Sequence, residues 1–99
     1  MIKVPVDEYV LTTLLADLVG HDRAPSAFLV YVAIWARTRG RRGAFTPASH
    51  ATLAEDTGLS KSAVQSGIRR LLQRKLIAAE RASATATPRY AVLRPWIRR

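Results

Sequence analysis

The sequence predicts a mainly α-helical domain that carries a small β-hairpin near its C-terminus. Apolar residues recur at helical spacing from about residue 6 to residue 72, and glycine and proline divide this part into four helices. Two short segments with β-forming residues follow after residue 76. A chain of 99 residues suits one domain, so we expect a single domain over 1–99.

Charge is the most informative feature of the composition. The formal net charge is +9, yet residues 1–22 sum to −3 and residues 23–99 to +12. This asymmetry favours a polyanion as partner. Cysteine is absent, which excludes disulfides and thiolate metal sites and fits a cytoplasmic location. The longest apolar run, Ala27–Ala36, has ten residues against roughly 20 for a membrane span, so no membrane partner is expected.

The first two helices are expected at Val6–Val19 and from Pro25 to about Thr38. Acidic residues begin the first helix, and Gly20 is expected to stop it, so that 1–20 forms an N-terminal unit. Its apolar stripe fits core packing, a dimer contact through residues 6–19, or both. The second helix lacks a polar face, which predicts the central and most buried helix.

Arginines and glycines follow the second helix, from Arg37 to Gly43. They fit either a solvated helix end or a contact with phosphate, and the sequence leaves both open. Ala44–Thr46 is a candidate for one short strand.

The third and fourth helices form the stretch around which the chain is organised, residues 47–75. Thr46 is the expected cap and Pro47 the first residue of a helix Pro47–Thr57. Gly58 then supplies a tight turn, and the fourth helix is expected at Ser60–Lys75, with Ser60 as its cap.

The fourth helix has two opposed faces. Its apolar face carries Val64, Ile68, Leu71 and Leu72, and the other face carries Ser62, Ser66, Arg69, Arg70 and Gln73. No Asp or Glu occurs from residue 60 to residue 79. An ordinary solvated helix would use acids for ion pairs four residues apart, so this face favours an anionic partner.

The C-terminal part predicts a hairpin of strands Ile77–Arg81 and Arg89–Leu93 with a small, polar tip between them. The hairpin unit spans 77–93, and a tail 94–99 follows. We expect Trp96 to pack back on the domain, and Arg98 and Arg99 to be mobile.

The segment LAEDTGLSKSAVQSGIRRL, followed by LIAAER and PRYAVL, resembles the winged helix-turn-helix family of bacterial and phage regulators and replication initiators. The resemblance covers about residues 24–93 and implies four helices plus a two- or three-stranded wing. Two positions depart from the pattern. Gly67 lies inside the fourth helix, which indicates either close backbone approach or local flexibility, and Lys75 stands where such proteins often have glycine.

The resemblance implies that the N-terminal half of the fourth helix enters the major groove of DNA. The residues that would then read base edges are Lys61, Ser62, Gln65 and Ser66. Contacts with the DNA backbone would come from Thr46, Ser49, Ser60, Arg69, Arg70, Arg74, Arg81 and Arg89.

The expected function is therefore sequence-specific binding of double-stranded DNA by a regulator of transcription. One alternative is the DNA-binding module of a plasmid or phage replication initiator; another is a module for protein–protein contact through the first helix. Single-stranded nucleic acid is less favoured, because the few aromatic residues look buried. No catalytic residue, metal site, cofactor or small-molecule ligand is indicated, since His21 and His50 lie far apart and no enzyme motif is present.

Overall fold

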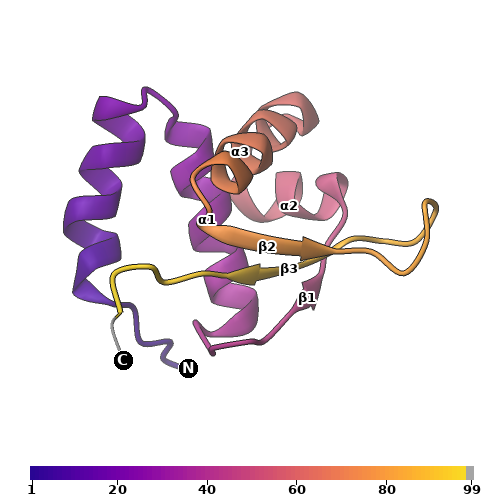
Figure 1. Ribbon diagram of the computed structural model, residues 1–99, viewed down its shortest axis with the longest axis horizontal. Helices are drawn as coiled ribbons and strands as arrows, with labels where there is room; N and C mark the ends of the chain where they lie inside the picture. The colour runs from indigo at the N-terminus through magenta and orange to yellow at the C-terminus, as the bar shows by residue number, and fades with distance from the viewer. Residues whose placement is uncertain (98–99) are drawn as a thin grey trace.

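Four helical stretches and a three-stranded antiparallel sheet make up residues 1–97, the part of the chain that the computed structural model describes (Figure 1). An N-terminal helix covers residues 8–21 and contains two π-helical stretches, η1 (Val10–Leu14) and η2 (Ala16–His21). The remaining elements are α1 (Pro25–Thr38), β1 (Thr46–Pro47), α2 (His50–Thr57), α3 (Lys61–Gln73), β2 (Ile77–Glu80) and β3 (Arg89–Val92). The predicted fold class, a winged helix-turn-helix of four helices plus a two- or three-stranded wing, is confirmed, and the sheet has three strands.

The sheet has the order β1-β3-β2, so its central strand is the last strand of the chain. β2 and β3 pair from Ile77 opposite Val92 to Glu80 opposite Arg89. β1 adds two residues on the other side of β3, with Thr46 opposite Tyr90. Beyond this ladder the loop between β2 and β3 projects away from the helices (Figure 1). The expected hairpin is thus confirmed, with β1 as its third strand.

The core is built around α1, as predicted. Tyr31 and Ile34 of α1 are fully buried, and Trp35 is 3% exposed. The N-terminal helix packs against α1 with Val10, Leu14 and Leu18, and α3 does so with Val64, Ile68 and Leu71. One strip of α1 is nevertheless open, because Leu29 is 42% and Val32 40% exposed. The lack of a polar face therefore does not mean that α1 is covered on every side.

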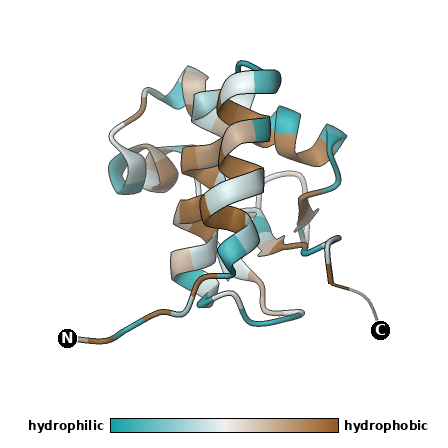
Figure 2. Ribbon diagram, turned by 90° about the vertical axis from the view of Figure 1, so that its left-hand side faces the viewer, coloured by the Kyte–Doolittle hydropathy of each residue, from teal (hydrophilic) through white to brown (hydrophobic). Residues whose placement is uncertain are grey.

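The N-terminal helix runs further than the sequence indicated. Gly20 lies inside η2 rather than ending the helix, and the amide of Asp22 still donates to the carbonyl of Asp17 at 2.7 Å. Bonds that reach five residues back widen the turn beyond 3.6 residues, so positions four apart stay nearly in line. Leu11, Leu15 and Val19 consequently form an exposed apolar stripe beside the buried one. Figure 2 views the molecule from the side of the N-terminal helix, coloured by hydropathy.

The predicted start of the third helix is wrong. Thr46 and Pro47 belong to β1, and α2 begins at His50 with Ser49 as its cap. The Ser49 hydroxyl accepts a hydrogen bond from the Thr52 amide at 3.1 Å. β1 is an edge strand, where a proline without an N–H is tolerated, and pairing with β3 takes Thr46 out of the helix.

Both ends of α3 are closed by identifiable hydrogen bonds. The Ser60 hydroxyl accepts from the amide of Ala63 at 3.1 Å, which confirms Ser60 as the cap. At the other end Lys75 adopts a left-handed conformation with φ of 56°. The amides of Lys75 and Leu76 then donate to the carbonyls of Leu72 (3.1 Å) and Leu71 (2.9 Å), respectively. This is the Schellman arrangement that a glycine usually completes, formed here by a lysine.

The two ends of the described chain are joined through Asp7. Its carboxylate accepts two hydrogen bonds from Arg94, at 3.0 and 3.1 Å, and one from Trp96 Nε1 at 2.9 Å. The Trp96 ring stacks on Tyr9 at 4.5 Å between centroids, which confirms that Trp96 packs back on the domain. The expectation for Arg98 and Arg99 lies outside the described residues.

Candidate nucleic-acid interface

The solvent face of α3 carries the four residues that the sequence assigned to base reading, together with Arg69 and Arg70 from those assigned to the DNA backbone. The core side of the helix holds Val64, Ile68 and Leu71 in the interior, so the opposite side must face solvent. The exposed polar residues on α3 are Lys61, Ser62, Gln65, Ser66, Arg69, Arg70 and Gln73, and Arg74 follows as the C-cap. This face therefore presents hydrogen-bonding groups near the helix N-terminus and arginines further along, and no acid.

α2 borders one side of this face. The Gln65 amide nitrogen lies 3.3 Å from Nδ1 of His50, which orients the Gln65 side chain between the two helices. The hydroxyls of Ser49 and Ser60 each accept a capping hydrogen bond from their own helix. A hydroxyl that accepts one bond can still donate another, so both can turn a proton outward.

The connection between the N-terminal helix and α1, residues 22–26, borders the other side. A Cβ atom on Gly67 would lie 3.0 Å from the carbonyl oxygen of Ser26 and 3.2 Å from Cα of Ala27. This confirms the close backbone approach that the sequence offered as one explanation of Gly67. The absence of a side chain at Gly67 therefore allows the connection to lie directly against α3.

Arg74 is turned toward this connection. Its Nη1 donates to Asp22 at 2.6 Å, and Nδ1 of His21 lies 3.2 Å from the other oxygen of the same carboxylate. The Asp22 side chain is only 7% exposed, and its burial raises the pKa of the carboxyl. The hydrogen bonds from His21 and Arg74 outweigh this cost, so the pKa of Asp22 is lowered overall. Arg74 therefore holds the connection in place through a carboxylate that stays ionised.

The wing arginines lie at the base of the hairpin, as expected, and both are exposed. Nη1 of Arg81 donates to the carbonyl of Ala84 at 3.0 Å, which ties the loop back on itself. Arg89 pairs with Glu80 at 2.9 Å and lies over the ring of Phe45 at 5.6 Å. Exposed pairs of this kind are weak, so a phosphate can compete for both arginines.

Two residues at this surface were not singled out by the sequence. His50 contacts Gln65 from α2, and Arg23 reaches the α3 surface from the connection. No sequence pattern places either residue at this surface, because each is far from the solvent face of α3 along the chain. The one available hint was Gly67, which indicated that some segment must pass close to α3.

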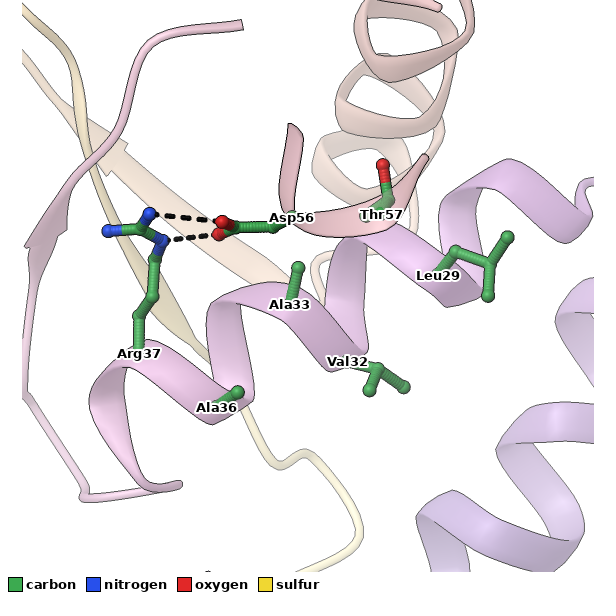
Figure 3. A pocket seen from close by; sticks show the side chains of 7 residues that line it. All are labelled: Leu29, Val32, Ala33, Ala36, Arg37, Asp56 and Thr57. Carbon is green, nitrogen blue, oxygen red and sulfur yellow. Dashed lines mark hydrogen bonds and ion pairs between the residues drawn. The ribbon is translucent and has the colours of Figure 1, made fainter. Parts of the chain in front are cut away.

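A second surface feature lies on the open strip of α1. Leu29, Val32 and Ala36 line a groove of about 510 Å³ that is closed at one end by the ion pair of Arg37 with Asp56 (Figure 3). The two hydrogen bonds of this pair measure 2.5 and 3.2 Å. Arg37 is therefore engaged within the fold, whereas Arg39, Arg41 and Arg42 are exposed.

The geometry is that of a helix-turn-helix: a capped second helix joined by a glycine turn to an amphipathic third helix with a basic outer face. A family model described as a helix-turn-helix domain matches residues 24–77, which is more than half of the chain. The chain belongs to this helix-turn-helix family, and that membership indicates DNA binding. The match spans α1 to the start of β2, so the N-terminal helix and most of the wing lie outside it.

No curated protein and no solved structure matches the chain. Among residues 1–97, no helix has both the length and the apolar character needed to cross a bilayer.

Proposed function

We propose that the protein binds double-stranded DNA in a sequence-specific manner and regulates transcription from the cytoplasm. In this proposal the N-terminal half of α3 enters the major groove, and the wing lies on the adjacent backbone or minor groove. The observation that carries it is the solvent face of α3, which has exposed hydrogen-bonding and basic side chains and no acid. Such a face repels itself unless an anion lies against it.

Roles within the interface follow from side-chain chemistry. Lys61, Ser62, Gln65 and Ser66 are assigned to base edges, where glutamine pairs with adenine and lysine with guanine. Arg69, Arg70, Arg81 and Arg89 are assigned to phosphates, together with the capping hydroxyls of Ser49 and Ser60. Two of the predicted backbone contacts are not included in this assignment. Thr46 is 9% exposed and lies in the sheet, and Arg74 forms an ion pair with Asp22.

Substitutions on α3 test this division. Titration of labelled duplexes against salt should give a steep loss of affinity for the unchanged protein, and no binding at low salt would refute the proposal. Gln65→Ala should cost about 1–3 kcal/mol at the preferred sequence and little elsewhere. Arg70→Ala should weaken all sequences alike and lower the salt slope by about one. Equal losses on every sequence for both variants would contradict the base-reading role of Gln65.

A homodimer through the N-terminal helix is the companion proposal. Leu11, Leu15 and Val19 form its exposed stripe at a spacing of four residues, on a helix outside the matched family region. A dimer would place two α3 helices on half-sites about 34 Å apart, which predicts an inverted repeat in the target. The same DNA-binding surface would also serve a replication initiator, and an inverted repeat next to the gene itself favours transcriptional control.

Leu11→Glu should abolish the dimer, because it places a charge within the apolar contact. Thr13→Glu is the matched control, since Thr13 is exposed on another side of the same helix. Sedimentation equilibrium measures the outcome, and a monomer for the unchanged protein at the highest soluble concentration would exclude this dimer.

A further inference from the structure

An open cleft of about 390 Å³ lies between the 22–26 connection and α3. Arg23 lines it from the connection, and Arg69 and Arg70 line it from α3. Ser66, assigned above to base edges, lies on its rim, so the cleft adjoins the reading face directly. Three guanidinium groups brought together from two segments make this a strongly basic hollow.

The cleft keeps its positive charge because the negative charge of Asp22 is balanced by its ion pair with Arg74. Asp22 lines the cleft, but its carboxylate is held by Arg74 at 2.6 Å. Within residues 1–97, no ion pair involves Arg23, Arg69 or Arg70. Arginine presents planar donors that match phosphate oxygens, which is why such groupings suit phosphate rather than a carboxylate-rich partner.

The position of Arg23 is fixed rather than incidental. The amide of Asp22 donates to Asp17 and that of Ala24 to Leu18, both at 2.7 Å, so the backbone on each side of Arg23 is tied to the N-terminal helix. Arg23 itself has a φ of 52°, an uncommon conformation for a residue with a side chain. At the far end of the connection, Ser26 is held against Gly67 of α3.

Two flanks therefore border the reading face, α2 with His50 on one side and the 22–26 connection with Arg23 on the other. The major groove is about 12 Å wide and has one phosphate strand on each side. When α3 lies in the groove, each of these two flanks faces one of the two DNA strands. The strand that faces the connection would pass over the arginine cleft.

We propose that the cleft between the 22–26 connection and α3 binds a phosphate of the DNA backbone, with Arg23 and Arg70 as its donors. This phosphate belongs to the strand across the major groove from the one that α2 faces. The inference rests on the proposed DNA binding, and it adds a contact from outside the helix-turn-helix pair. Arg23 sets the depth and angle of α3 in the groove without reading a base.

Arg23→Asn tests the contact, because asparagine tolerates the positive φ and the change removes the guanidinium group. On a duplex of random sequence it should weaken binding about five- to tenfold near 0.1 M salt and lower the salt slope by about 0.9. Arg23→Lys should keep most of the slope. Lys3→Asn is the control: it removes one positive charge from an exposed residue that is assigned no contact with DNA, and it should leave the slope unchanged.

The outcomes separate this inference from the proposed function. If the unchanged protein binds no duplex, DNA binding itself is refuted. If it binds and Arg23→Asn keeps the full slope, or Lys3→Asn loses as much, the cleft contact alone is refuted. Calorimetry with inorganic pyrophosphate forms the second arm. Loss of pyrophosphate binding in Arg23→Asn with unchanged duplex binding would assign the cleft to a free phosphoanion and overturn the backbone contact.

Discussion

Replacing Gly40 by alanine is expected to destabilise the domain by ~3 kcal/mol or more. A Cβ atom there would lie 2.5 Å from two carbon atoms of the Trp35 ring. The ring cannot withdraw easily, because it is 3% exposed and its Nε1 donates to the carbonyl of Pro5 at 2.9 Å. Gly40 also has a φ of 66°, which adds the cost of a left-handed residue with a side chain.

Gly43→Ala separates the two contributions to this effect. Gly43 has a φ of 73°, but a Cβ atom on it would meet nothing within 4 Å. It should therefore show only the backbone cost, ~1–2 kcal/mol. Thermal unfolding of both variants gives the difference, with 1 kcal/mol corresponding to about 4–8 °C for a domain of this size. Equal shifts for the two variants would show that Trp35 yields to the added methyl group.

Gly67→Ala is expected to destabilise the domain by about 1–2 kcal/mol, although alanine is the better helix former. The gain in helix propensity is at most about 1 kcal/mol. Against it, the methyl group would press on backbone atoms of Ser26 and Ala27 at 3.0 to 3.2 Å, and backbone at the start of α1 cannot rotate away as a side chain can. The lost contact between α3 and α1 then outweighs the propensity.

Gly20→Ala is expected to stabilise the domain, in contrast to Gly67→Ala. Gly20 also lies inside a helical stretch, is exposed, and would carry a Cβ atom with no neighbour within 4 Å. Only the propensity gain remains, so this variant should unfold at a higher temperature, by an amount worth up to about 1 kcal/mol. Stabilisation by both alanines would mean that the α1–α3 contact adjusts without cost. Because Gly67→Ala also shifts the 22–26 connection, its duplex affinity should fall more than that of Gly20→Ala.

Much of the fold could be predicted because the local sequence of α1 and α3 favours the same helices that tertiary packing requires. The caps, the glycine turn at Gly58 and the apolar face of α3 each act over a few residues and need no distant partner. The helix start at Thr46 and Pro47 failed for the opposite reason. Thr46-Pro47 is a valid helix start locally, but pairing with Tyr90, more than forty residues later, decides its conformation.

The candidate site was predictable only where it lies on one helix. Spacing along α3 places Gln65 and Arg70 on the solvent face without any knowledge of the fold. Arg23 and His50 reach the same surface only through tertiary packing, and Arg74 is drawn away from it by Asp22. The ion pair of Arg74 with Asp22 joins residues 52 positions apart, and no local sequence pattern indicates it. The composition therefore overstated the number of cationic side chains available to DNA.

The strand order has a consequence for how the domain forms during synthesis. β3 is the only strand with two neighbours in the described sheet and the last strand to leave the ribosome, so β1 and β2 have no pairing partner until residue 92 has emerged. The four helices contain their own hydrogen bonds and can dock earlier, with α3 against α1. A nascent chain arrested before residue 89 would therefore hold the reading helix and two unpaired strands at once, which makes this intermediate open to edge-to-edge association.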